Sequence, residues 1–165
     1  MIKILGIDVG LNCTGWGVIN LPYNKTNTIV YCASGVIRHK QSQKLPLEDK
    51  LNNINHNISH IIQQYSQDAI LQVAIEEVFS NKNTLSSQRL SMAKAAIMIA
   101  LSNNHLPYQK YTTTQIKKAI TGSGRADKQQ IRYMIENVLL HVKCDYTDEY
   151  DAIGTAICHA FHIST

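Results

Sequence analysis

With 165 residues, 44% of them hydrophobic, the chain is long enough for one domain with a buried core. No apolar run reaches 18 residues and the short apolar start does not resemble an export signal, so we expect neither a membrane span nor secretion. The net charge is +4, but residues 79–144 carry ten Lys or Arg and two acids, which indicates a polyanionic partner such as nucleic acid or, more simply, a solvated basic face.

The predicted elements follow one another in an order that defines the fold class. Three closely spaced strands come first and should pair as an antiparallel meander. Helices and strands then alternate, and helices complete the chain. We expect strands at 3–9, 14–20, 28–38, 71–79 and 107–111, and helices at 47–66, 84–101, 112–120, 127 to about 140 and 148–162. This order predicts an α/β protein in which helices flank a five-stranded mixed sheet in three layers, as one domain over residues 1–165.

The four cysteines contain no CxxC pair, and they are most simply read as free reduced thiols of a cytoplasmic protein. The histidine pairs His56/His60 and His159/His162 have helical spacing but no third ligand at metal spacing. We therefore interpret them as surface or core histidines.

Acidic residues stand at the ends of three apolar segments. Asp8 ends the first strand, Glu76 and Glu77 end the fourth, and Asp148 and Asp151 share the first turn of the last helix. Each has a plain structural alternative, as a turn residue, a solvated edge residue or a helix cap. In open α/β sheets, however, sites form at the carboxyl ends of strands. Alternation along the fourth strand lets only one of its two glutamates face Asp8, and does not say which.

Four carboxylates that converge would repel one another, and hard divalent cations would remove that repulsion. All-oxygen ligation suits Mg²⁺ or Mn²⁺. Two such ions about 4 Å apart can activate a water and stabilise the leaving oxygen in phosphodiester cleavage. The acids therefore indicate a hydrolase that acts on phosphodiesters.

Basic and aromatic residues near the acids suggest contacts with nucleic acid. Lys117 and Lys128 could contact a phosphate, Phe79 could stack on an unpaired base, and the turn with Gly122 and Gly124 could let backbone amides approach a phosphate. Solvated lysines, a core phenylalanine and a plain flexible turn are the alternatives. Weaker candidates for backbone contacts are Lys118, Arg125 and Arg132.

The segment 84–101 is apolar on more than one side in its second half. Such a helix is buried all round. In a small domain this favours one face on the sheet and another on a second subunit, although burial within one subunit remains the alternative.

Four segments together resemble one family. "ILGIDVGLNCTGWGVI", "AIEEVF", "QIKKAITGSGRADKQQI" and "DEYDAIGTAICH" are similar, in order and spacing, to motifs of the RuvC family of Holliday junction resolvases. These endonucleases belong to the RNase H-like superfamily, and the resemblance runs nearly end to end. Each motif alone is weak, but four in the correct order are specific.

The resemblance implies metal-binding catalytic carboxylates at Asp8, Glu76, Asp148 and Asp151, and it selects Glu76 over Glu77. It implies Mg²⁺ as cofactor, with Mn²⁺ as a substitute and two ions per subunit during catalysis. It also implies a homodimer that nicks opposed strands of a four-way DNA junction during recombination and repair, with the RuvA and RuvB branch-migration motor as partner.

By the same resemblance, Lys117 and Lys128 lie close to the scissile phosphate and Phe79 lies near the junction centre. Two departures stand out. Val9 replaces a more usual proline after the first acid. The ending "FHIST" lacks the basic tail of some relatives, so junction affinity would depend more on the 82–132 segment.

Three other functions can be weighed against this one. "GIDVGLNCTG" also resembles the phosphate loop of actin-like sugar kinases, but those chains need two such domains and are far longer. A related nuclease of ribosomal RNA precursors is closer, but "TGSGRADK" and Phe79 fit the junction resolvase better. A junction-binding protein without cleavage would have no need for all four acids.

Overall fold

The computed structural model describes residues 1–22, 29–39, 45–77, 84–139 and 142–163. Five strands and five α-helices form along the chain, and one helix continues into a π-helical turn. The strands are β1 (Ile2–Asp8), β2 (Cys13–Leu21), β3 (Val30–Arg38), β4 (Ile70–Glu77) and β5 (Tyr108–Thr112). The helical elements are α1 (Leu47–Ser66), α2 (Thr84–Asn103), α3 (Thr113–Thr121), α4 (Lys128–Met134), η1 (Ile135–Leu139) and α5 (Thr147–Ile163).

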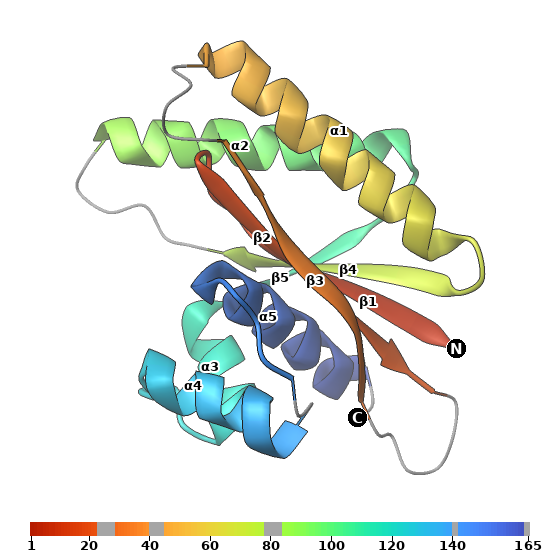
Figure 1. The fold of residues 1–165 in the computed structure, drawn as a ribbon, viewed down its shortest axis with the longest axis vertical. Coiled ribbons are helices and arrows are strands. Elements are labelled where there is room, and N and C mark those ends of the chain that lie inside the picture. The colour runs from red at the N-terminus through yellow and green to blue at the C-terminus, as the bar shows by residue number, and fades with distance from the viewer. Residues whose placement is uncertain (23–28, 40–44, 78–83, 140–141, 164–165) are drawn as a thin grey trace.

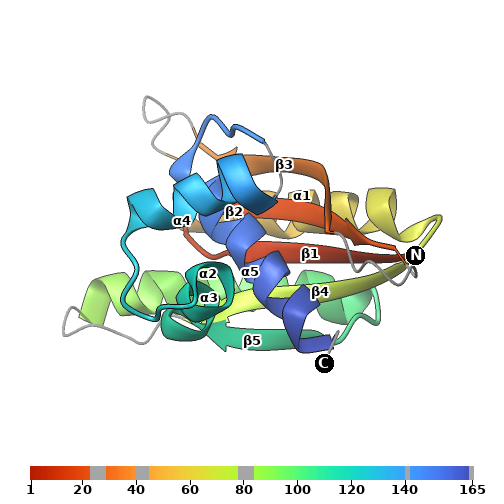
Figure 2. The same ribbon diagram turned by 90° about the horizontal axis from the view of Figure 1, so that it is seen from below.

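The strands form one mixed sheet in the order β3-β2-β1-β4-β5. β1, β2 and β3 pair antiparallel, as predicted for the meander, whereas β4 runs parallel to β1 and β5 parallel to β4. Helices α1 and α2 cover one face, and α3, α4 and α5 lie on the other (Figures 1 and 2). The prediction of three layers is confirmed, and the parallel arrangement brings the carboxyl ends of β1, β4 and β5 to one edge.

A separate hydrophobic core fills the space on each face of the sheet. Alternation along β1 sends Leu5 and Ile7 toward α1 and α2, and Ile4 toward α5. Ile97 on the first side and Ile153 on the second are fully buried. Each such side chain contributes about 1.5–3 kcal/mol to stability relative to an exposed one. Since both faces are covered, β1 lies at the centre of the molecule.

Glycines let α5 rest directly on β1 and β2. A Cβ atom at Gly6 would lie 2.0 Å from the carbonyl oxygen of Ala152, and one at Gly15 would lie 2.1 Å from that of Asp148. No side chain fits in that space, so backbone meets backbone. The first turn of α5 is thereby held at a fixed height above the ends of the strands.

Local sequence signals define most helix ends. Thr112 caps α3 in a capping box with Gln115, and Asp127 caps α4 in the same way with Gln130. Gly122 ends α3 with a φ of 77°, a left-handed conformation that glycine adopts without strain. Thr84 is a residue type that favours the cap position before a helix, but here it is the first helical residue of α2, and the position before it lies outside the described residues.

The helix predicted to run to about residue 140 changes character instead. α4 ends at Met134 and the chain continues as η1. π-helical turns occur mostly as single insertions at functional sites. Across the described ranges, no helix is long and apolar enough to cross a membrane.

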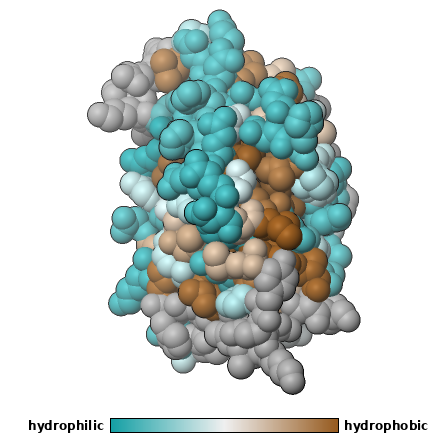
Figure 3. All heavy atoms as spheres, turned by 90° about the vertical axis from the view of Figure 1, so that its right-hand side faces the viewer, coloured by the Kyte–Doolittle hydropathy of each residue, from teal (hydrophilic) through white to brown (hydrophobic). Residues whose placement is uncertain are grey.

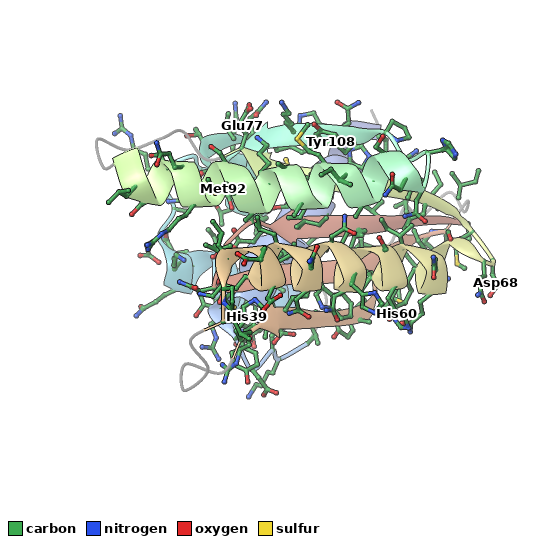
Figure 4. All side chains as sticks on the ribbon, turned by 90° about the horizontal axis from the view of Figure 1, so that it is seen from above. His39, His60, Asp68, Glu77, Met92 and Tyr108 are labelled. Carbon is green, nitrogen blue, oxygen red and sulfur yellow. The ribbon has the colours of Figure 1, made fainter. Side chains whose placement is uncertain are left out.

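The surfaces of the two helical layers differ. α1 and α2 lie side by side over the sheet, with Met92 on α2 (Figure 4). Hydrophilic side chains dominate the upper part of the face seen in Figure 3, and hydrophobic ones gather lower down. α2 buries Ala93, Ala96, Ile97, Ala100 and Leu101, yet exposes four large apolar residues: Leu85, Met92, Met98 and Ile99. Within the described residues, part of the surface of α2 is therefore apolar and exposed.

Candidate active site

A cavity of about 310 Å³ opens where the carboxyl ends of β1 and β4 meet the starts of α3, α4 and α5. All four carboxylates singled out in the sequence line it, together with both lysines of the same prediction. Its walls are formed by Asp8, Glu76, Thr113, Ile116, Lys117, Lys128, Ile131, Asp148, Tyr150 and Asp151. Residues from five separate elements thus share one small space.

The two glutamates at the end of β4 point to opposite faces of the sheet. Glu76 faces the cavity, where the hydroxyl of Thr113 donates a 2.6 Å hydrogen bond to its Oε1. Glu77 faces α2, with its Oε1 3.8 Å from the Nζ of Lys94 and 3.7 Å from that of Lys110 (Figure 4). The structure therefore places Glu76, and not Glu77, beside Asp8.

Crowding of acids and burial dominate the electrostatics of the cavity. Burial, the largest cause, and the nearby charges of Glu76, Asp151 and Asp148, in that order, together raise the pKa of Asp8 from 3.8 to about 8. Burial also raises the pKa of Glu76, opposed chiefly by the hydrogen bond from Thr113. In the absence of a cation, Asp8 would thus hold its proton at neutral pH.

Lys128 supplies positive charge within this cluster. Its Nζ lies 2.9 Å from Oδ2 of Asp151, and this hydrogen bond raises the pKa of Lys128. Its charge also lowers the pKa of Asp8 and Glu76. Lys117, one turn into α3, lines the same cavity and acts on Glu76 in the same direction.

The acidic residues in the first turn of α5 have different surroundings and different roles. Asp148 and Asp151 face the cavity, while Glu149 between them is buried. The Oε1 of Glu149 accepts the Tyr146 backbone N–H at 3.1 Å, and its Oε2 accepts the hydroxyl of Ser34 in β3 at 2.5 Å. Glu149 therefore fixes the start of α5 against the sheet, a role that sequence reasoning missed. Its position three residues after Tyr146, as in a capping box, was the available signal.

A second network ties α4 and η1 to α5. The Tyr150 hydroxyl donates a short hydrogen bond to Glu136 and accepts one from the Cys144 N–H at 2.8 Å. Arg132 pairs with Glu136 at 2.8 Å, and its guanidinium lies 5.2 Å from the centre of the Tyr150 ring. Arg132 was predicted as an ordinary backbone-contact candidate; its side chain is exposed, and its guanidinium is paired with Glu136 and stacked near the Tyr150 ring. The network holds α4, and with it Lys128, above the cavity.

The remaining predicted residues lie around the cavity rather than in it. Lys118 is exposed on α3, and its carbonyl accepts the Gly122 N–H at 2.9 Å, so that amide is already used by the helix cap. Gly124 packs beside Thr114. Arg125 lines a different cavity of about 620 Å³, with Tyr133. Phe79 lies outside the described residues, so its predicted contact is not placed.

Cys13 also lies near the acids, a position that was not predicted from the sequence. Burial raises the pKa of its thiol to about 11, and the charge of Asp148, which is hydrogen-bonded to it, acts in the same direction. The thiol is thus uncharged at neutral pH and adds no negative charge to the cluster.

The chemistry of the lining residues fits a hard divalent cation. Four carboxylates offer only oxygen ligands, and the repulsion that raises the pKa of Asp8 is what a cation would remove. Among the described side chains, no three acids, histidines or cysteines already stand together as a complete ligand set. The Lys128 ammonium, bonded to Asp151, instead supplies the charge there.

Fold and site together define a class of protein. A five-stranded mixed sheet between two helical layers is the RNase H-like fold, and here carboxylates gather at the ends of β1 and β4 and in the first turn of α5. The sequence model of one family, described as crossover junction endodeoxyribonuclease RuvC, matches residues 4–159. The chain therefore belongs to the RuvC family, which consists of metal-dependent nucleases that resolve Holliday junctions.

Relatives with this description share much of the sequence. The RuvC of Shewanella piezotolerans is 42% identical over 159 residues, covering 96% of this chain and 87% of the relative. That of Ehrlichia ruminantium is 37% identical over 163 residues, covering 98% of each. The resemblance drawn from four motifs is thereby confirmed across the chain.

Solved structures agree on the fold. Thermus thermophilus RuvC superposes with a TM-score of 0.83 at 22% identity, covering 98% of this chain and 95% of that one. The same protein in complex with a Holliday junction substrate gives 0.86 at 22% identity, covering 99% and 95%.

Proposed function

We propose that this chain cuts four-way DNA junctions with two Mg²⁺ ions held by Asp8, Glu76, Asp148 and Asp151. The observation that carries the proposal is that these four acids, from three separate segments, line one cavity with two lysines. When bound, the two ions would supply an activated water and stabilise the leaving oxygen of the scissile phosphodiester. Mn²⁺ would substitute, because it prefers the same oxygen ligands.

The lysines have complementary tasks in this proposal. Lys117 from α3 and Lys128 from α4, which both line the cavity, bind the phosphate that is cut and stabilise the charge that develops on it. Lys128 exchanges Asp151 for the DNA phosphate when cations occupy the acids. In the metal-free protein the Lys128 ammonium partly neutralises the negative charge of the acids, which helps the side chains around the cavity remain close together.

DNA outside the cavity would be held mainly through its backbone. Lys118 and Arg125 are exposed or line the neighbouring cavity, and both extend the positive surface away from Lys117 and Lys128. Gly122 and Gly124 shape the turn between α3 and α4. Phe79 follows β4 directly and would stack on a base at the junction centre. The RuvA and RuvB motor would deliver the junction, in the cytoplasm.

The purified protein should convert a synthetic four-way junction into two nicked duplexes when Mg²⁺ is present, and should leave linear duplex of the same sequence largely intact. Chelation should stop cleavage, and Mn²⁺ should restore it, because the acids depend on a cation to act. Denaturing gels of junctions labelled on each strand measure this directly. Cleavage at an undiminished rate in excess chelator would contradict the proposal.

We further propose that α2 forms a homodimer interface. Leu85, Met92, Met98 and Ile99 are 64%, 41%, 40% and 55% exposed, an apolar face that a single chain leaves in water. A two-fold dimer through this face would present two cavities to a junction of approximate two-fold symmetry. Paired nicks on opposed strands would then follow from symmetry.

Replacing Ile99 with Lys should shift the protein from dimer to monomer, because a charge on each copy would face its symmetry mate across an apolar contact. Light scattering after size-exclusion chromatography measures the mass. Ile163→Lys, a matched change on α5 at the opposite face of the sheet, should leave the dimer intact. A wild-type monomer at micromolar concentration would contradict the interface.

A further inference from the structure

We propose that Thr113 is a positioning residue that sets the metal-binding conformation of Glu76, an inference that rests on the proposed function. The Thr113 hydroxyl donates a 2.6 Å hydrogen bond to Oε1 of Glu76, and both residues line the cavity. None of the motifs in the sequence points to this residue. It adds a fixed partner to a ligand that otherwise ends a strand.

The chain fixes Thr113 by two means that do not involve Glu76. β5 pairs parallel with β4 so that Tyr111 lies opposite Glu76 and Thr112 opposite Glu77. The strand then stops, and Thr112 caps α3 through a capping box with Gln115. Thr113 is therefore the first residue of a helix whose start is locked, and its side chain returns toward the end of β4.

The same helix start gives consecutive threonines separate tasks. The Thr112 hydroxyl bonds Gln115, and its backbone N–H is accepted by the Gln115 side chain at 2.9 Å. The Thr113 hydroxyl remains available for Glu76. Thr114 packs beside Gly124, away from this bond. Only one of the three hydroxyls in the run therefore acts on the carboxylate.

A glutamate side chain has three rotatable bonds and loses more freedom on ordering than most residues. With Oε1 held by Thr113, those bonds are restricted and Oε2 remains for a cation. Without the hydroxyl, the cation must order the side chain by itself. Since a ligand gains affinity when its partner is preorganised, Thr113 should strengthen metal binding more than it strengthens DNA binding.

The test compares Thr113→Val, which removes the hydroxyl at nearly constant shape, with Thr113→Ser, which keeps it. Thr114→Val removes a hydroxyl one residue away and is the matched control. Mn²⁺ binding to each full-length protein without DNA is measured by titration calorimetry. The Mg²⁺ concentration for half-maximal cleavage and the junction affinity in chelator are measured in parallel.

Thr113→Val should weaken Mn²⁺ binding about 5- to 20-fold, near the lower end of the loss expected for a hydrogen bond to a charged group, because this bond is exposed to solvent. The half-maximal Mg²⁺ concentration should rise by a similar factor, junction affinity in chelator should stay unchanged, and Thr113→Ser and Thr114→Val should behave as wild type. Circular dichroism melting verifies that each variant is folded; if Thr113→Val does not fold, Thr113→Ala replaces it in the same comparison.

Unchanged Mn²⁺ affinity in a folded hydroxyl-free variant would overturn the inference. Equal weakening in Thr113→Ser, which keeps the hydroxyl, would also overturn it, because the loss of affinity would then not follow the presence of the hydroxyl. A wild-type protein that binds Mn²⁺ but cuts no junction would instead refute the proposed function, and the calorimetry would still decide the role of Thr113.

Discussion

Glu76→Gln should reduce junction cleavage by about 10³-fold or more, whereas Glu77→Gln should leave the rate within about twofold of wild type. Catalytic metal ions supply several kcal/mol of transition-state stabilisation, and each 1.4 kcal/mol corresponds to about a tenfold change in rate. Glu76 faces the cavity, and Glu77 pairs with Lys94 and Lys110 on the other face. The two changes are chemically identical and one residue apart.

Single-turnover cleavage of a labelled junction at saturating Mg²⁺ measures both rates. The Glu77 pairs are long and partly exposed, so Glu77→Gln should cost no more than about 1 kcal/mol of stability, visible as a small shift in Tm. Junction binding in chelator, by gel shift, should be close to wild type for both variants. Loss of cleavage in Glu77→Gln, or retention in Glu76→Gln, would reverse the assignment of the two faces.

Asp8→Asn should abolish cleavage and, in the metal-free protein at pH 8, make the fold more stable. Metal binding requires the charged form of Asp8. In the metal-free protein this form is disfavoured, because burial and three neighbouring acids raise the pKa of Asp8 from 3.8 to about 8. Asparagine carries no charge to bury. The expected gain is about 2–4 kcal/mol, set below the full linkage limit because water reaches part of the cavity.

The pH dependence gives this prediction a distinctive form. Between pH 4 and pH 8, the folded wild type keeps the Asp8 proton while the unfolded chain has lost it, so the unfolded state binds fewer protons. The free energy of unfolding of the wild type therefore falls as pH rises through this window. The difference between Asp8→Asn and wild type should be near zero at pH 4 and largest at pH 8 and above.

Thermal melts from pH 4 to pH 9 measure the difference, which should reach about 5–10 °C at the upper end. Saturating Mg²⁺ should reduce this difference in melting temperature, because the cation binds the Asp8 carboxylate of the wild type more strongly than the asparagine of the variant. Junction binding in chelator should survive the substitution. A variant less stable than wild type at every pH would show that the Asp8 carboxylate is not crowded in the metal-free protein.

Local signals were enough to predict most of the fold. The strands follow from β-branched apolar runs, the start of α4 from Asp127 with a glutamine three residues later, and the mixed sheet from strands that alternate with helices after β3. The change from α4 to η1 was not predicted. The Glu136 side chain in this turn is bonded to Tyr150 from α5, which lies far along the sequence.

The site was predictable as a list of acids but not as an arrangement. Alternation shows that Glu76 and Glu77 diverge but not which one faces the cavity; the family resemblance selected Glu76, and the pairs with Lys94 and Lys110 show that Glu77 faces α2. Thr113 and Glu149 were missed because their partners, Glu76 and Ser34, come from distant strands. Arg132 was predicted as a candidate for contact with the DNA backbone, and its pairing with Glu136 was not foreseen because it depends on the turn between α4 and η1.

The bare contact between α5 and the first hairpin has a consequence for how such a site can change over time. With Gly6 and Gly15 pressed against the main chain of α5, the gap between Asp8 and the helical acids is set by peptide thickness rather than by any side chain. Substitutions elsewhere can change the surface charge or the affinity for DNA in small increments. A larger distance between Asp8 and the acids of α5 would require a side chain at the glycine contacts, which would displace the whole helix. The spacing of these acids should therefore change less in evolution than the other features of the site.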